Sequence, residues 1–86
     1  MKAKIFITYK EGILDPEGTT VNKALNSMGI DHIESLDIGK YIQMEFGDIS
    51  RQEAERICEE ACSSLLANHN TEKYHYEILE NEWNLV

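Results

Sequence analysis

The hydrophobic pattern changes period along the chain, and this change constrains the fold more than any other feature. Residues 2–10, "KAKIFITYK", alternate between two sides, with Ala3, Ile5, Ile7 and Tyr9 on one and Lys4, Phe6, Thr8 and Lys10 on the other. Such alternation is typical of a β-strand. Phe6 on the second side indicates that this side of the strand is not simply exposed to water.

A helix is predicted directly after the glycine-containing loop in "GILDPEGTTVNKAL", residues 12–25. Asp15 is a favourable N-cap because its carboxylate can accept the free amide protons of the first turn. Pro16 suits the first helical position, where no N–H is needed. Apolar residues then recur at helical spacing, at Val21, Ala24, Leu25 and Met28. Because Gly29 suits a helix end, the predicted helix covers residues 16–28.

The stretch "HIESLDIGKYIQMEF", residues 32–46, alternates again. One parity holds Leu36, Ile38, Ile42, Met44 and Phe46, with Lys40 as the polar exception. The pattern predicts either one long bent strand or two strands joined near Gly39. A two-residue hairpin turn would normally break the parity, which favours a bulge or bend at Gly39–Lys40.

The last third of the chain predicts a second helix and a final strand. Ser50 and Glu53 have the spacing of a capping box. A helix of about 51–67 places its apolar residues on one face, namely Ala54, Ile57, Cys58, Ala61, Leu65 and Leu66. "KYHYEIL", residues 73–79, alternates as a strand should.

This order of elements predicts an α+β fold. Strand, helix, two strands, helix and strand form a ferredoxin-like βαββαβ sandwich, with a four-stranded antiparallel sheet and two helices on one face. We interpret residues 1–86 as a single domain, in which residues 80–86 are a polar C-terminal tail that carries Trp83.

Size and charge exclude several classes of partner. The chain has 86 residues and a formal net charge of −8, which disfavours nucleic acid and anionic membrane surfaces. It has no apolar run long enough to span a membrane and no signal-peptide pattern, so we expect a cytoplasmic protein. A domain this small buries little apolar surface, and oligomerisation is a common remedy.

The titratable residues form no recognisable catalytic, cofactor or metal set. Cys58 and Cys62 lie on the apolar helix face, where a thiol is not activated. His32, His69 and His75 lack metal-ligand spacing and are interpreted as surface or loop residues. The helix start would repel phosphate, since Pro16 lacks a donor and acidic residues surround it.

Lys40 is the one residue that two interpretations explain equally well. It interrupts an apolar parity between Gly39 and Tyr41. A lysine in such a place can protect a sheet edge from unwanted pairing, or it can contact another subunit. The sequence leaves both alternatives open.

Three stretches together carry a resemblance to a known family. "GILDPEGTTVNKALNSMG", then "DIGKYIQMEF", then "EEACSSLLANHNTEKYHYEI" resemble the PurS family, the small subunit of phosphoribosylformylglycinamidine (FGAM) synthase. The resemblance runs from about residue 2 to residue 80. "LDPEG" leading into "KAL", and "IGKYI" downstream of it, are the most specific pieces.

The resemblance implies a function in de novo purine biosynthesis. FGAM synthase is a glutamine-dependent carbon–nitrogen ligase that converts formylglycinamide ribonucleotide, ATP and glutamine to formylglycinamidine ribonucleotide, ADP, phosphate and glutamate. A large synthetase subunit (PurL) binds ATP and Mg²⁺, and a glutaminase subunit (PurQ) releases ammonia. The small subunit is non-catalytic, binds no cofactor itself, forms a homodimer or higher homo-oligomer, and bridges the other two.

For this chain the resemblance therefore implies an assembly role and inactivity in isolation. The residues expected at or near a subunit interface are Asp15, Pro16, Gly18, Gly39, Lys40 and Tyr41. The alternative is a ferredoxin-like regulatory module that binds a small metabolite. A free-standing small enzyme is disfavoured because no catalytic constellation is present.

Overall fold

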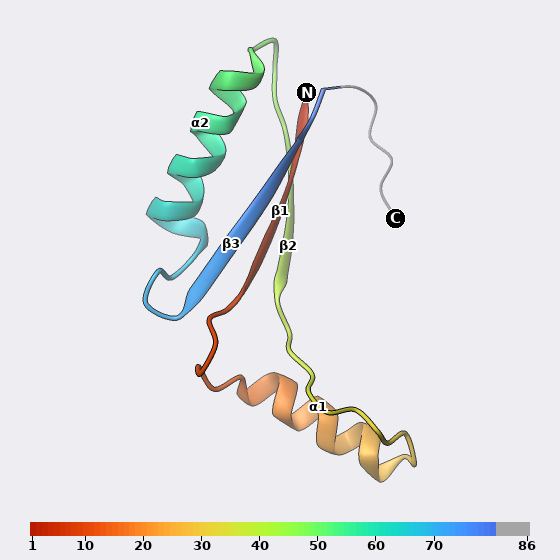
Figure 1. The fold of residues 1–86 in the computed structure, drawn as a ribbon. Helices are drawn as coiled ribbons and strands as arrows, with labels where there is room; N and C mark the ends of the chain where they lie inside the picture. The colour runs from red at the N-terminus through yellow and green to blue at the C-terminus, as the bar shows by residue number, and fades with distance from the viewer. Residues whose placement is uncertain (81–86) are drawn as a thin grey trace.

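The computed structural model describes residues 1–80, which form three strands, two α-helices and one π-helical turn. Their bounds are β1 Lys2–Tyr9, α1 Pro16–Ser27, β2 Lys40–Glu45, α2 Arg51–Ala61, η1 Cys62–Leu66 and β3 Glu72–Leu79 (Figure 1). β1, α1, α2 and β3 begin within one residue of their predicted places. The single-domain interpretation stays a prediction, and Trp83 lies outside the described residues.

The three strands form one antiparallel sheet in the order β2-β1-β3. The register places Phe6 of β1 between Tyr41 of β2 and His75 of β3. β2 and β3 are both edge strands, so each has one side without a strand partner among the described residues. The predicted α+β class with an antiparallel sheet is confirmed.

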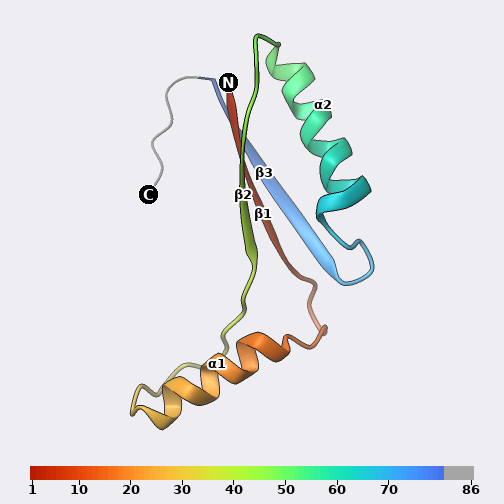
Figure 2. The same cartoon turned by 180° about the vertical axis from the view of Figure 1, so that it is seen from behind.

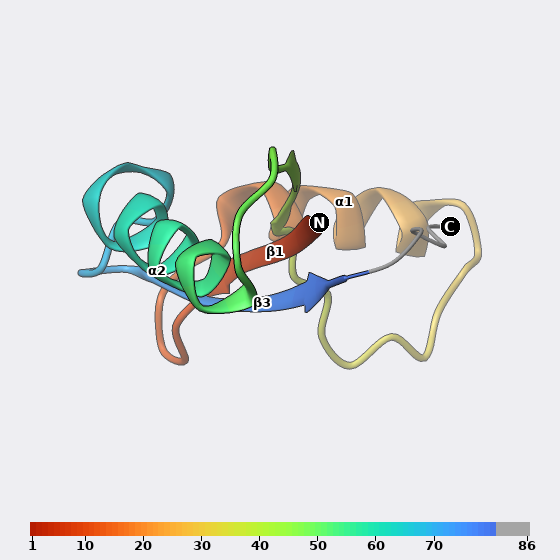
Figure 3. The ribbon, with the colours of Figure 1, turned by 90° about the horizontal axis from the view of Figure 1, so that it is seen from above.

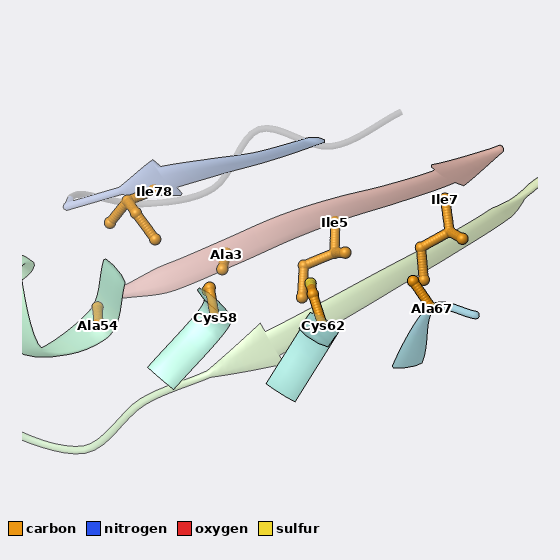
Figure 4. Packing of buried hydrophobic residues seen from close by; sticks show 8 residues of the cluster. All are labelled: Ala3, Ile5, Ile7, Ala54, Cys58, Cys62, Ala67 and Ile78. Atoms are coloured by element: carbon orange, nitrogen blue, oxygen red, sulfur yellow. The ribbon is translucent and has the colours of Figure 1, made fainter. Parts of the chain in front are cut away.

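The hydrophobic core lies between the sheet and α2. β1 contributes Ala3, Ile5 and Ile7, which are almost completely buried because β1 is the central strand. They meet the helix side chains Ala54, Cys58 and Cys62, with Ala67 and Ile78 at the margins (Figure 4). The apolar face predicted for the second helix packs on the sheet at Ala54 and Cys58, but Leu65, which was placed on the same face, is 82% exposed because the helix widens into η1 after Ala61.

The helix ends follow local chemistry. The Ser50 side chain accepts the Glu53 amide at 3.1 Å at the start of α2, and Asp15 caps α1. Gly29 adopts a φ of +86° just after α1, a left-handed conformation that glycine tolerates best. Beyond Ala61 the helix widens into η1, and Ala67 N donates to Cys62 O at 3.0 Å.

The expectation that both helices cover one face of the sheet is wrong for α1. α2 packs against β1 and β3, whereas α1 lies beyond the end of the strands (Figures 1 and 2). The view along the strands shows α2 beside β3 and the loop after α1 swinging away from the sheet (Figure 3). The link before α1 leads outward because Lys10 N is bonded to Thr71 O and Gly12 has a φ of +82°.

The expected fourth strand is also absent from the described residues. Residues 31–39 run without a ladder, and β2 begins only at Lys40. His32 has a φ of +69°, which breaks the extended run. The Ile38 amide donates to the Asp15 side chain at 2.7 Å instead of to a strand. Residues 31–39 instead run back along α1 (Figure 1), and the ladder of β2 begins at Lys40, directly after Gly39.

Candidate functional site

The candidate site is the junction between α1 and the sheet, and Asp15 lies at its centre. Its Oδ1 accepts the Gly18 amide at 2.9 Å, and its Oδ2 accepts the Ile38 amide at 2.7 Å. The side chain is therefore more than the N-cap that the sequence predicts. It also ties the start of α1 to a segment 23 residues further along the chain.

The electrostatics of the junction keep Asp15 ionised. Its hydrogen bonds from the Gly18 and Ile38 amides hold the pKa of the carboxyl below its ordinary value, against a smaller opposing effect of burial. Asp15 is only 7% exposed, and both carboxylate oxygens already accept backbone amides. The group is thus built to hold structure, and its geometry does not suit a general base.

Two glycines let the backbones approach closely at this junction. A Cβ on Gly18 would lie 2.5 Å from Asp15 Oδ2 and 2.6 Å from Leu36 O. A Cβ on Gly39 would lie 2.6 Å from Ile7 O and 3.0 Å from Thr8 Cγ2. Both glycines are needed for packing, since larger residues would force the segments apart.

Lys40 is the first residue of β2 and follows the segment whose Ile38 amide is bonded to Asp15. Its Nζ lies 3.9 Å from Glu72 Oε2, and its side chain is 63% exposed while that of Glu72 is 15% exposed. Since β2 is an edge strand, edge protection remains compatible with this position. A subunit contact is equally compatible, so both interpretations of Lys40 stay open.

The structure brings five of the six predicted interface residues together and separates one. Asp15, Pro16 and Gly18 start α1, and the Asp15–Ile38 bond places Gly39 and Lys40 next to them. Tyr41 instead stacks on Phe6, with ring centroids 5.1 Å apart. Their role in an interface stays a prediction.

A groove lies beside this junction, between α1 and residues 34–37. It encloses about 460 Å³. Asn22, Lys23 and Asn26 line it from the helix, and Asn22 Oδ1 is buried without a hydrogen-bond partner among the described residues. The lining mixes acidic, basic and apolar side chains, so it selects no chemical class of ligand.

The cysteines and histidines lie where the sequence predicts. Cys58 and Cys62 are free thiols in the core, and burial raises the pKa of both. His32, His69 and His75 are exposed. Within residues 1–80, no group of three or more His, Cys, Asp or Glu side chains is placed to hold a metal ion.

Two aromatic clusters form that the strand pattern alone does not predict. On the helix side of the sheet, the Tyr74 and Tyr76 hydroxyls both donate to the Glu59 carboxylate, and the bond to Glu59 raises the pKa of Tyr74 to about 12. On the opposite side, Phe6 stacks with Tyr41 and His75. Parity alone puts each set on one face, but only the register makes its members neighbours.

These features define a small α+β protein built around a three-stranded antiparallel sheet. Its buried carboxylate, Asp15, and its close-packed glycines, Gly18 and Gly39, lie where α1 joins the sheet. The described part of the chain contains no helix that is both long and apolar enough to cross a membrane. The family described as "PurS: Phosphoribosylformylglycinamidine (FGAM) synthase" matches residues 2–80. The chain belongs to this family, which confirms the resemblance drawn from the three sequence stretches.

Curated relatives agree over nearly their whole length. The chain is 37% identical over 79 residues to the phosphoribosylformylglycinamidine synthase subunit PurS of Bacillus subtilis, covering 92% of this chain and 93% of the relative. It is 39% identical over 74 residues to the PurS subunit of Archaeoglobus fulgidus, covering 86% and 92%. The function is therefore that of a subunit of FGAM synthase.

Solved structures of the family share the fold. A B. subtilis PurS structure superimposes with a TM-score of 0.83 at 37% identity, covering 92% of this chain and 98% of that one. A chain in the structure of PurLQS from Thermotoga maritima superimposes with a TM-score of 0.81 at 29% identity, covering 91% and 95%. The extended arrangement of α1 and sheet is thus compatible with a family fold.

Proposed function

We propose that this chain is the assembly subunit that joins the synthetase PurL to the glutaminase PurQ, so that ammonia passes between their sites. The observation that carries this proposal is family membership along nearly the entire chain, together with a structural neighbour from PurLQS of T. maritima. The junction supports it, because Asp15 and the two close-packed glycines serve structure and offer no reactive group.

The chemistry of the reaction then belongs to the partners. ATP and Mg²⁺ bind to PurL and glutamine binds to PurQ, while this chain binds no cofactor. A purine-biosynthetic assembly of this kind works in the cytoplasm.

We further infer that the chain acts as a homodimer in which α1 of each copy covers the other copy. The apolar residues Val21, Ala24, Leu25 and Met28 are all at least partly exposed, and the one buried residue of α1 is Gly18. A 12-residue helix is marginal in water and normally needs to bury its apolar face. Within the single chain, the apolar face of α1 does not pack against the sheet.

The sheet offers the complementary surface. Ile42 and Met44 of β2 lie on the α2 side of the sheet at the margin of the core and are only partly buried, because α2 packs on β1 and β3. The radius of gyration is 16.2 Å, whereas a compact chain of this length has about 12 Å. A second copy, with its α1 seated over Ile42 and Met44, would bury what one copy leaves open.

Two neighbouring substitutions test the dimer. Met28 is 71% exposed and belongs to the apolar stripe, so Met28→Glu should leave the single chain folded but weaken the dimer at least about tenfold. Ser27→Glu adds the same charge one residue away, off the stripe, and should have little effect. Light scattering over a dilution series measures both. Equal dimer stability for the two variants would overturn the exchange of α1.

The junction residues are tested in the complete assembly. Lys40→Glu should weaken binding to PurL and PurQ without unfolding the chain, and Lys23→Glu on α1 is the charge-matched control. Circular dichroism checks the fold of both. Normal assembly with Lys40→Glu would count against the interface role and favour edge protection.

Reconstitution is the decisive experiment. Glutamine-dependent product formation by PurL and PurQ should require this chain, whereas ammonia-dependent turnover should proceed without it. The three chains should also co-elute. If turnover ignores the chain and nothing co-elutes, the assembly role is wrong. In that case a saturable thermal shift with one metabolite, abolished by filling the α1 groove with Asn22→Trp, would support the regulatory-module alternative.

A further inference from the structure

One side of the chain from residue 33 to residue 45 has no strand partner among the described residues. In an extended chain, the N–H and C=O of one residue point to the same side and those of the next residue to the other. Even-numbered residues use theirs within the chain, since the Phe46 amide donates to Met1 O at 2.9 Å and the Ile38 amide to Asp15 at 2.7 Å. The opposite side, which we call the free edge, is formed by Ser35, Asp37, Tyr41 and Gln43.

Both halves of the free edge have the character of a strand. Residues 40–45 are β2, whose outer side is unpaired. Residues 33–38 continue the alternation of β2, with Leu36 and Ile38 in its apolar parity, yet they form no ladder (Figure 1). A Cβ on Gly18 would lie 2.6 Å from Leu36 O, so α1 occupies the other side of this segment. The free edge therefore continues the outer side of β2.

The free edge is complementary to itself. An antiparallel pairing of two copies about a two-fold axis at Gly39 places residues 33–38 of each copy against β2 of the other. Residues of the same face meet, and no two charges of like sign lie directly opposite each other. The opposed pairs are Asp37 with Tyr41, Ser35 with Gln43, Leu36 with Ile42, Glu34 with Met44, and Ile38 with Lys40.

Neighbouring registers are less favourable. An axis at Lys40 would place the two copies of Lys40 opposite each other, and an axis at Ile38 would oppose Asp31 and Glu45. Like charges directly opposite each other destabilise a strand pair. The charges of the chain thus select the register centred on Gly39.

We propose that residues 33–38 of one copy add a fourth strand to the sheet of a second copy by pairing with the outer side of its β2, and that the second copy does the same in return. The inference rests on the proposed homodimer and specifies its contact. Asp15 ties α1 to this segment, so the pairing carries α1 onto the other copy, as the exchange of α1 requires. Addition of an extended segment to an open sheet edge is a common mode of recognition.

A second copy suits this edge better than an unrelated strand does. Only a second copy supplies both halves of the pairing, so that two stretches of ladder form at once. Each copy has a net charge of −8, but four glutamates of the chain lie on α2, which packs on β1 and β3. The contact at β2 is therefore made away from this concentration of charge, and its backbone hydrogen bonds do not depend on it.

Introduced cysteines test the register. Cys58 and Cys62 are completely buried, so a short bismaleimide should link only introduced thiols. When Ser35→Cys and Gln43→Cys chains are unfolded and refolded together, the two variants should crosslink to each other. Neither should crosslink alone, because each introduced thiol lies roughly 27 Å from its own counterpart. Lys73→Cys on β3 is the control and should not link to Ser35→Cys.

Opposite charges at one position test the same register by affinity. Tyr41→Asp and Tyr41→Lys both remove the ring that stacks on Phe6, but only the lysine variant faces Asp37 of the other copy with an opposite charge. The lysine variant should dimerise more tightly than the aspartate variant by a factor on the order of ten. His75→Asp and His75→Lys on β3 introduce the same two side chains away from the free edge and should differ much less. Light scattering over a dilution series measures all four.

Each result has a distinct meaning. Crosslinking in the mixture alone, with the expected order of the Tyr41 variants, supports the strand pairing. If the chain dimerises but the mixture does not crosslink, the strand pairing is wrong while the homodimer stands. If Gln43→Cys links to itself, the two β2 strands pair directly and the inference is also wrong. A monomeric chain would overturn both the homodimer and the inference.

Reconstitution with PurL and PurQ is measured separately from these experiments. A chain that forms the expected crosslink but does not assemble with them would overturn the assembly role and leave the strand pairing intact. Circular dichroism excludes unfolding of the variants.

Discussion

The packed half of this protein and its α1 arm are stabilised in different ways. The packed half, made of the sheet, α2, η1 and Ala67, contains every buried apolar residue among those described. The α1 arm, made of α1 and residues 10–15 and 28–39, buries only Asp15 and Gly18. One half holds itself together by apolar burial, whereas the other depends on a buried carboxylate, close backbone packing and, as we propose, a second copy.

The largest expected effect comes from truncating a buried side chain of the packed half, compared with truncating an apolar side chain of the α1 arm. Ile5 is completely buried in the central strand, so Ile5→Ala should lower the free energy of unfolding by about 2–5 kcal/mol. Val21→Ala in the α1 arm should cost much less, because Val21 is only partly buried. Urea unfolding at a concentration where the chain is monomeric measures both. Equal losses would show that the arm has a core of its own.

The next effect concerns the join between the halves. In Gly39→Ala the new Cβ would meet the Ile7 carbonyl oxygen at 2.6 Å, and backbone cannot move aside cheaply. The expected loss is about 1–3 kcal/mol. Gly47→Ala is the matched control, since its Cβ would meet nothing within 4 Å. Thermal unfolding compares the two, and equal midpoints would mean that residues 31–39 shift without cost.

A smaller effect concerns Asp15 and depends on pH. Because the folded chain lowers the pKa of Asp15 below its ordinary value of 3.8, the carboxylate contributes stability above that value and loses it as the pH falls through the lowered pKa. Asp15→Asn would turn a donor toward one of the two amides that Asp15 binds. Hydrogen exchange at the Ile38 amide should then accelerate at neutral pH, with Asp37→Asn unchanged. Protection of Ile38 that persists in Asp15→Asn would contradict this role.

The smallest effect lies within the packed half and leaves its stability nearly unchanged. The hydrogen bond to Glu59 raises the pKa of Tyr74 to about 12. Glu59→Gln keeps an acceptor but removes the charge, so the pKa of Tyr74 should fall toward its ordinary value of 10. Ultraviolet absorption of tyrosinate during an alkaline titration measures the change. Glu60→Gln, whose carboxylate pairs with Arg56 instead, should leave the titration unaltered.

Features that depend on near neighbours in the chain could be predicted from the sequence. Asp15 and Ser50 cap the helices because a side chain needs to reach only the next turn. Gly29 ends α1 because a left-handed conformation is a property of one residue. Cys58 and Cys62 are buried because they lie on the apolar side of a local helical period.

The sequence by itself determined these caps, the alternation of the strands, the inward face of α2 and, through three specific stretches, the family. Only the tertiary structure decided that residues 31–39 follow α1 instead of forming a strand, that α1 lies beyond the sheet, and that Phe6 lies between Tyr41 and His75. The physical reason is that a strand forms only where its backbone finds hydrogen-bond partners. Side chains on different strands become neighbours only when the register of the paired strands is fixed. Both are supplied by residues distant in sequence, which alternation alone does not specify.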